Sequence, residues 1–381
     1  MKHSLVRLGD ICTVVSGSTP KSGISDYWDG DVVWITPAEL TEDSYIINDS
    51  VRHITQKAVQ ETSLKPFPAG TVILSSRAPI GKTAIAGREM YCNQGFKNLI
   101  CSSRVNNKYL YFFLSCKTEY LNSLGRGATF KEISKTIVEN IEIPLPGIPE
   151  QKRIATEFEH IQGLEQGFQK QVSFFDQLVK SQFVEMFGDP LHPVHSRALG
   201  DVAVLERGRF SPRPRNDPRY YGGDYPFIQT GDIAGCGHRL SEYRQTLNEK
   251  GIHVSKKFSA GTIVIAIVGA TIGATAILEI DVYAPDSVIG ISVNDELYNN
   301  VFMEALLQFW QPELVRIAPE SARANINLGI LQSIPIIDVE LPRQIQFAAF
   351  VAQVDKSKVE IQKAIDQLEI LKKSLMQQYF G

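Results

Sequence analysis

The residues with the clearest chemical signature form an arginine-rich stretch at positions 207–221. Its prolines at 212, 214 and 218 exclude a helix, so we expect an extended, exposed loop. A guanidinium group matches both the major-groove edge of guanine and phosphate oxygens, and arginines clustered without lysine favour a nucleic-acid ligand. A solvated loop and a docking surface for an acidic protein are the alternatives. The aromatic residues in the stretch are Phe210, Tyr220 and Tyr221, and its arginines are Arg207, Arg209, Arg213, Arg215 and Arg219.

Weaker basic candidates lie at matching places in the two halves of the chain. The counterpart of the arginine stretch is a loop at 16–21 with one basic residue, Lys21. A single residue of this kind is more often an ordinary surface charge than a DNA contact, so the prediction depends on the repetition. Arg126 and Arg323, for example, each come just before a predicted helix. The other candidates, in loops at the ends of predicted strands, are Arg77, Lys82, Lys97, Lys131, Lys256, Lys257 and Asn325.

Sequence stretches that approach enzymatic motifs lack the residues on which those motifs depend. Gly-Lys-Thr at 81–83 follows a predicted strand, but a phosphate-binding loop needs glycine where this chain has Ser76, and Pro79 stiffens the turn. The Asn/Asp-Pro-Pro-aromatic motif of amino-methylating enzymes is absent, as is a glycine-rich turn for a nucleoside cofactor. Carboxylates that a nuclease would gather around a metal ion are spread singly. We therefore expect no catalytic centre and no cofactor in this chain.

The composition is that of an ordinary globular protein. The chain has 381 residues, of which 43% are hydrophobic and 21% charged, and its net charge of −3 means that any DNA binding must come from local basic clusters. The five cysteines include no Cys-x-x-Cys pair, and prolines separate His192 from His195, so no metal site is expected. The most apolar run, 263–268, is too short to cross a bilayer. These features predict a cytoplasmic protein without a membrane partner.

Several short motifs of the first half of the chain recur in the second half. Leu-Gly-Asp at 8–10 recurs at 199–201, and Ala-Gly-Thr at 69–71 recurs at 260–262. Lys-Ser at 180–181 recurs at 373–374, and Phe-Gly at 187–188 recurs at 380–381. Four matches in order, at an almost constant offset, indicate an internal duplication.

Each half ends in a predicted long helix opened by proline, Pro149 in one and Pro342 in the other. Such a helix would be about 58 Å long at 1.5 Å per residue. Apolar residues with 3-4-3 spacing predict a seam, and the opposite net charges of the helices favour their pairing with each other. The alternative is that each helix packs on its own globular domain. The predicted seam residues are Phe158, Ile161, Phe168, Val172, Phe175 and Leu178 in the first helix, and Val351, Val354, Ile361, Ile365, Leu368 and Leu371 in the second.

The globular segments in front of the helices mix short β-rich runs with helical stretches, which predicts an α+β class. We therefore expect two pseudo-repeated globular domains separated by two long antiparallel helices that form a coiled coil. The predicted boundaries are 1–148 and 189–341 for the globular domains, and 149–188 and 342–381 for the helices.

Along essentially its whole length the sequence resembles the specificity (S) subunits of Type I restriction–modification systems. The resemblance rests on Leu-Gly-Asp at 8–10, Ser-Thr-Pro at 18–20, residues 77–81, and Ile-Pro-Leu-Pro at 143–146 followed by Glu-Gln-Lys-Arg-Ile-Ala at 150–155. The corresponding junction in the second half, 336–344, keeps only Pro342 and Gln344 of that last pattern.

The resemblance implies that each globular domain is a target-recognition domain that reads one half of a split double-stranded DNA target. The helices would set the spacing and dock two methyltransferase subunits, which bring S-adenosylmethionine. Restriction/translocase subunits would bring ATP and magnesium. Because the two loops differ so much in arginine, we expect unequal half-sites and an asymmetric target. The rival interpretations are a fused or stand-alone DNA methyltransferase and a coiled-coil adaptor without a DNA role.

Overall fold

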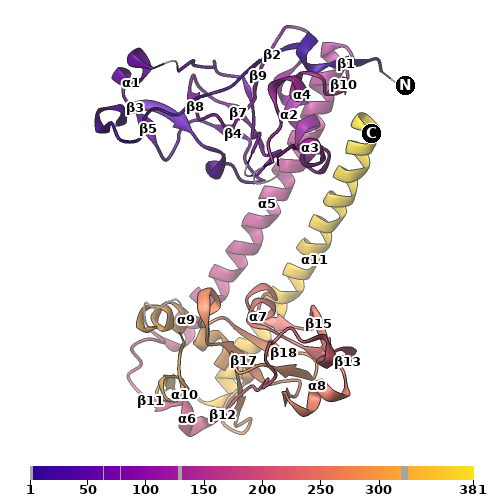
Figure 1. Ribbon diagram of the computed structural model, residues 1–381. Helices are drawn as coiled ribbons and strands as arrows, with labels where there is room; N and C mark the ends of the chain where they lie inside the picture. Colours follow the sequence, from indigo (N-terminus) through magenta and orange to yellow (C-terminus); the bar gives the residue numbers. More distant parts are fainter. Residues whose placement is uncertain (1–2, 63, 78, 128–130, 319–324) are drawn as a thin grey trace. The chain divides into compact units, whose positions relative to one another are not determined.

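The structure is a computed structural model that describes residues 3–62, 64–77, 79–127, 131–318 and 325–381 (Figure 1). It contains two compact units. Unit 1 comprises residues 1–168 and 363–381, and unit 2 comprises residues 169–362. Two long helices, α5 (Ile148–Phe187) and α11 (Leu341–Phe380), each contribute one part to each unit.

Unit 1 contains a five-stranded sheet in the order β2-β9-β6-β7-β4. Strand β6 is buried along its whole length because it lies between neighbours and is covered on both faces, which suits its unbroken Val-Ile-Leu sequence. A three-stranded sheet in the order β5-β3-β8 and the pair β1-β10 complete the β structure that the described residues contain. The strands are β1 (Leu5–Arg7), β2 (Cys12–Val15), β3 (Trp28–Ile35), β4 (Ile46–Ile47), β5 (His53–Ile54), β6 (Val72–Leu74), β7 (Thr83–Ala86), β8 (Tyr91–Cys92), β9 (Asn98–Cys101) and β10 (Glu142–Pro144). The helices are α1 (Gln56–Glu61), α2 (Asn107–Ser115), α3 (Thr118–Leu124) and α4 (Lys135–Glu139).

Unit 2 repeats this topology. Its five-stranded sheet has the order β12-β20-β17-β18-β14, the second sheet has the order β15-β13-β19-β16, and β11 pairs with β21. Strand β16 is the one addition among the described strands. The strands are β11 (Ser196–Ala198), β12 (Ala203–Arg207), β13 (Tyr221–Phe227), β14 (Arg239–Leu240), β15 (Gln245–Leu247), β16 (Lys256–Phe258), β17 (Ile263–Ala266), β18 (Thr275–Leu278), β19 (Val282–Ala284), β20 (Val288–Val293) and β21 (Pro335–Ile337). The helices are α6 (Leu199–Val202), α7 (Thr230–Gly235), α8 (Glu249–His253), α9 (Asn300–Ile317) and α10 (Leu328–Gln332).

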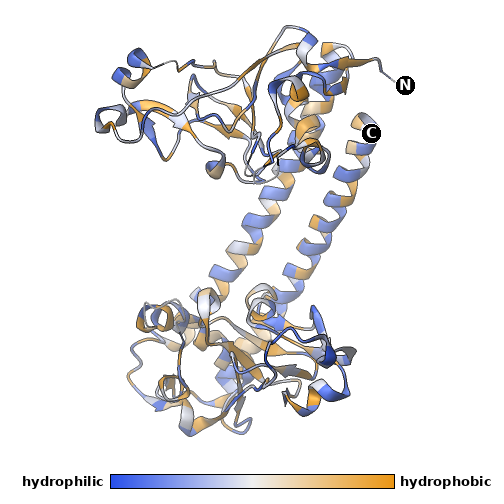
Figure 2. Cartoon of the chain, in the orientation of Figure 1, coloured by the Kyte–Doolittle hydropathy of each residue, from blue (hydrophilic) through white to orange (hydrophobic). Residues whose placement is uncertain are grey.

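The ends of the long helices belong to the cores of the units. In unit 1 the ring of Phe158 on α5 stacks on Phe112 of α2 at 5.1 Å and on Phe380 of α11 at 5.8 Å. In unit 2 Phe183 of α5 contacts Phe302 of α9 at 5.3 Å and Phe347 of α11 at 5.4 Å. Figure 2 shows that both long helices alternate between hydrophobic and hydrophilic positions. The expected α+β class with two repeated domains is confirmed.

One buried glutamine joins the start of each long helix to its domain. The Gln151 side chain accepts a hydrogen bond from the Asn106 amide at 2.8 Å, and Gln344 accepts one from the Asn299 amide at 2.8 Å. Asn106 and Asn299 also cap α2 and α9, so each glutamine fixes one helix to the N-terminus of another. The glutamine amides donate to backbone carbonyl oxygens of Arg104 and Pro146 in unit 1 and of Leu297 and Val339 in unit 2.

Within the described residues, no helix combines the length and apolar character that crossing a membrane requires. The same part of the chain holds no group of three or more His, Cys, Asp or Glu side chains arranged to bind a metal ion.

Candidate nucleic-acid interface

The arginine loop of unit 2, residues 207–221, is anchored by glycine and by aromatic packing. A Cβ on Gly208 would lie 2.1 Å from the Pro285 carbonyl oxygen, so only glycine lets the loop leave β12 this close to the end of β19. Phe210 is buried and packs against Phe227, with ring centroids 5.2 Å apart. The Tyr221 hydroxyl donates to the Arg215 carbonyl oxygen at 2.5 Å. These aromatic rings therefore hold the loop in place and leave its arginines at the surface.

Three arginines of this loop converge on Asp286, in the turn between β19 and β20. One Asp286 carboxylate oxygen accepts from Arg215 Nη2 at 2.5 Å, and the other lies 3.6 Å from Arg213 Nη2. Arg207 Nε donates to the Asp286 carbonyl oxygen at 2.6 Å. Arg213 Nη1 also donates to the Phe210 and Pro212 carbonyl oxygens, at 2.8 Å each. The side chains of Arg213 and Arg215 nevertheless remain 57% and 49% exposed.

The other two arginines of the loop have different partners. Arg209 Nη2 donates to the backbone carbonyl oxygens of His253 and Ser255 at 3.2 and 3.1 Å, so its charge faces no carboxylate there. The exposed Arg219 forms an ion pair with the half-buried Asp217 at 2.6 Å. Hydrogen bonds from Arg219 hold the pKa of Asp217 below its ordinary value. Of these two arginines, Arg209 thus has the less neutralised charge.

The remaining candidates of unit 2 lie near the two sheets. Lys256 pairs with Glu206 at 2.8 Å and Lys257 pairs with Asp281 at 2.7 Å, both at the surface. Asn325 is exposed and its backbone bridges to that of Val268. Arg323 lies outside the described residues.

Two lysines chosen from the sequence of unit 1 point into the protein. Lys97 is 8% exposed in its side chain and pairs with Glu132 at 3.0 Å, while its Nζ lies 3.3 Å from Ser76 Oγ. Lys82 Nζ donates to the Leu40 carbonyl oxygen at 2.6 Å. Both ammonium groups have protein partners, which favours structural roles over DNA contacts.

The other unit 1 candidates lie at or near the surface. Lys21, Arg126 and Lys131 are exposed and Arg77 is half-buried. The backbones of Arg77 and Arg126 both bridge to that of Glu132, so these two residues are close together. Lys21 lies in a loop whose Thr19 hydroxyl donates to Gln94 Oε1 at 2.6 Å.

Comparison with known protein families identifies the repeated unit. The model of the Type I restriction modification DNA specificity domain matches residues 3–172 and matches again at residues 193–369. The chain belongs to this family. The resemblance drawn from the junction motifs is confirmed.

Several relatives are similar to parts of this chain. The MjaIX type I restriction enzyme specificity subunit of Methanocaldococcus jannaschii is 36% identical over 244 residues, which cover 58% of this chain and 56% of that protein. The EcoprrI specificity subunit of Escherichia coli is 21% identical over 377 residues, 91% of this chain and 86% of that one. The chain thus spans about half the length of its 36% identical relative.

Two solved structures share the fold of this specificity-domain chain. One is a Type I restriction–modification S subunit from M. genitalium, with a TM-score of 0.55 and 14% identity, covering 99% of this chain and 96% of that one. The other comes from work on complex assembly and conformational transition of the type I R-M system, with a TM-score of 0.60 and 19% identity, covering 99% and 97%.

One residue that was predicted to lie in the seam of the long helices is exposed in the structure. Leu371 is 47% exposed, because 3-4 spacing leads from Leu368 to Lys372 and leaves Leu371 beside the seam. The remaining predicted seam residues are buried or half-buried: Phe158, Ile161, Phe168, Val172, Phe175, Leu178, Val351, Val354, Ile361, Ile365 and Leu368.

Charged residues at seam positions were missed in the sequence because only apolar residues were counted. In unit 1 Lys372 of α11 pairs with Glu165 of α5 at 2.8 Å, and in unit 2 Lys358 of α11 pairs with Asp176 of α5. Continuing the 3-4 spacing from Ile161 and from Val354 reaches Glu165 and Lys358 directly. The regular spacing was therefore the signal that could have found them.

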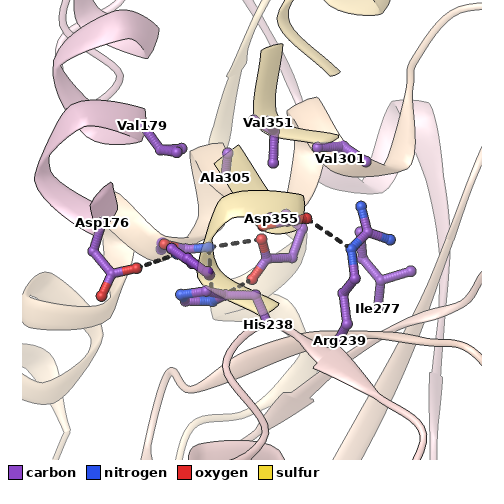
Figure 3. A pocket seen from close by; sticks show the side chains of 12 residues that line it. Asp176, Val179, His238, Arg239, Ile277, Val301, Ala305, Val351 and Asp355 are labelled. Atoms are coloured by element: carbon purple, nitrogen blue, oxygen red, sulfur yellow. Dashed lines mark hydrogen bonds and ion pairs between the residues drawn. The ribbon is translucent and has the colours of Figure 1, made fainter. Parts of the chain in front are cut away.

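A polar cluster in the second specificity domain was also missed (Figure 3). It surrounds a cavity of about 30 Å³, which has room for roughly one water molecule. The buried Glu304 accepts from the Thr275 hydroxyl at 2.7 Å and from Gln308 Nε2 at 2.7 Å, and its Oε1 lies 3.2 Å from His238 Nδ1. Burial alone would lower the pKa of His238, but the hydrogen bond and the charge of Glu304 raise it above 6.5. The size of the cavity and its internal pairing suit a structural cluster.

Proposed function

We propose that this chain is the DNA-sequence specificity subunit of a Type I restriction–modification complex and carries no catalytic centre of its own. The observation that supports this most is the presence of two specificity domains in one chain, each joined to a part of the same two helices. The proposed division places recognition domains at 1–148 and 189–341, and spacer helices at 149–188 and 342–381.

Each recognition domain would read one half of a split double-stranded DNA target. The arginine loop supports this role in the second domain because exposed guanidinium groups bind phosphates and guanine edges. The matching loop of the first domain offers Lys21 alone. Unequal loops support an asymmetric target.

The long helices would dock two methyltransferase subunits and support restriction/translocase subunits. Apolar side chains are exposed to water on both helices. A protein partner that covered them would bury this apolar surface, which favours a docking role for the helices. S-adenosylmethionine, ATP and magnesium would enter with those partner subunits, in the cytoplasm. The exposed apolar residues are Leu164, Phe174, Val184, Ile345, Val359, Ile370 and Leu371.

The test is methylation-sensitive long-read sequencing of DNA from cells that co-express this chain and a methyltransferase subunit. We expect a split motif of methylated adenines that is present only with this chain. The control expresses the methyltransferase alone. Identical methylation in both cells, despite a purified complex of the two proteins, would contradict the proposal and favour an adaptor role.

A further inference from the structure

We propose that Asp286 is a positioning residue for DNA recognition, which aligns the guanidinium groups of Arg213 and Arg215 and prevents indiscriminate phosphate binding. This inference rests on the proposed function and adds a specificity-determining residue outside the arginine loop. Asp286 is acidic and comes from the β19–β20 turn, so no basic-residue pattern in the sequence points to it.

The geometry favours positioning because Asp286 contacts two like charges, of which Arg213 is also held by the Phe210 and Pro212 carbonyl oxygens. Its two carboxylate oxygens face different arginines, at 2.5 Å from Arg215 and 3.6 Å from Arg213. Two guanidinium groups that share one carboxylate are held side by side against their mutual repulsion. The Asp286 side chain is itself 36% exposed, so it lies at the surface that a ligand would approach.

The equivalent position in unit 1 supports the same role. Gln94 follows the end of β8 by two residues, as Asp286 follows the end of β19. Gln94 accepts a hydrogen bond from Thr19, in the loop that corresponds to the arginine loop. In both units a glycine brings the loop against this turn: a Cβ on Gly17 would lie 1.9 Å from the Cys92 carbonyl oxygen, and Gly208 makes the matching approach in unit 2. The turn therefore holds the loop in both domains, with a neutral side chain in one and a carboxylate in the other.

The carboxylate also opposes non-specific binding. It offsets one of the positive charges of the loop and repels phosphate oxygens, so a DNA backbone must compete with it for the guanidinium donors. Replacing it by the isosteric amide removes the competition and the alignment together. Affinity for arbitrary DNA should then rise while the readout of one half-site becomes less strict.

The experiment compares the Asp286→Asn complex with wild type in two measurements. Binding to a non-target duplex as a function of salt should give a log–log slope steeper by about 0.9 for each additional phosphate that the freed arginines bind. Long-read methylation mapping should show degenerate bases in the half-site read by the second domain and an unchanged other half. Asp338→Asn is the matched control, because Asp338 pairs with Arg197 at 3.3 Å at a similar exposure but outside the loop.

A double-mutant cycle separates positioning from a general structural role. In an Arg213→Ala/Arg215→Ala background, adding Asp286→Asn should leave the motif unchanged and change the slope less than in the wild-type background, because the groups it aligns are gone. An equal effect of Asp286→Asn in both backgrounds, or no effect in the wild-type background, would overturn the inference. If the double arginine variant itself keeps wild-type affinity and motif, the proposed DNA role of the loop fails instead.

Discussion

Lys97 and Lys131 are both basic residues that were predicted to lie in loops at strand ends, yet the structure gives them opposite surroundings. Lys97 is buried beside Glu132, whereas Lys131 is exposed. The partner of Lys97 lies 35 residues away in the sequence, and local spacing carries no information about such a contact. Sequence reasoning could therefore find basic residues but could not sort surface cations from buried ones.

Substitutions of the two lysines should have different effects on stability and DNA binding. Lys97→Met should lower the free energy of unfolding by about 1–3 kcal/mol, because Ser76 and Glu132 lose a charged partner, and should leave the salt slope of DNA binding unchanged. Lys131→Met should leave stability unchanged and flatten the slope if Lys131 contacts phosphate. Chemical denaturation and DNA titration of the complex measure both. A flatter slope for Lys97→Met at normal stability would contradict the structural role of Lys97.

His238 should make the stability of unit 2 depend on pH. Its pKa is raised in the folded state, so its pairing with Glu304 stabilises the fold fully below the ordinary pKa of 6.5 and ceases to do so as pH rises through the folded value. The surrounding charges are Asp176 and Lys358. His238→Asn should therefore reduce the loss of thermal stability as pH rises above 6.5. His192→Asn, at an exposed histidine outside this cluster, is the matched control for the substitution.

At the scale of elements, the buried glutamines explain why the second junction retains a glutamine when most of its pattern has changed. Gln344→Leu would leave the Asn299 amide and two carbonyl oxygens without their partner, and should cost more than about 2 kcal/mol of unfolding free energy. Gln346→Leu, two residues further on the same helix and exposed, is the matched control. Chemical denaturation measures the stability of both variants. Equal stability would show that the hydrogen bonds of Gln344 do not stabilise the fold.

The charged pairs at the seam should favour the packing of α5 against α11. Glu165→Lys or Lys372→Glu alone places like charges against each other, so each should destabilise unit 1, whereas the double exchange should recover most of the loss. We expect a coupling of about 1 kcal/mol, above that of an exposed pair. The control is the same exchange on the exposed Glu369–Lys373 pair of α11, whose coupling should be smaller. Thermal unfolding of the four variants measures the cycle, and additive effects would exclude a role for the pair.

At the scale of the whole molecule, the repeat was the most informative feature of the sequence. Offset matches such as Leu-Gly-Asp at 8–10 and 199–201 located two domains of the same strand order, because duplicated segments keep their core and turn residues. The prolines at 149 and 342 placed the helix starts within one residue of the structure. The role of Asp286 and the inward direction of Lys82 depend on contacts between distant segments, which periodicity cannot predict.

The division of both long helices between the two units has a consequence for biosynthesis. Unit 2 is one continuous segment, whereas unit 1 needs residues 363–381 to complete its core, where Phe380 is buried against Phe158. On the ribosome, the domain that emerges first is therefore the last to close. Until translation reaches Phe380, the nascent first domain lacks the ring that packs against Tyr109, Phe113 and Phe158. This reverses the usual order in which N-terminal domains complete their folding first.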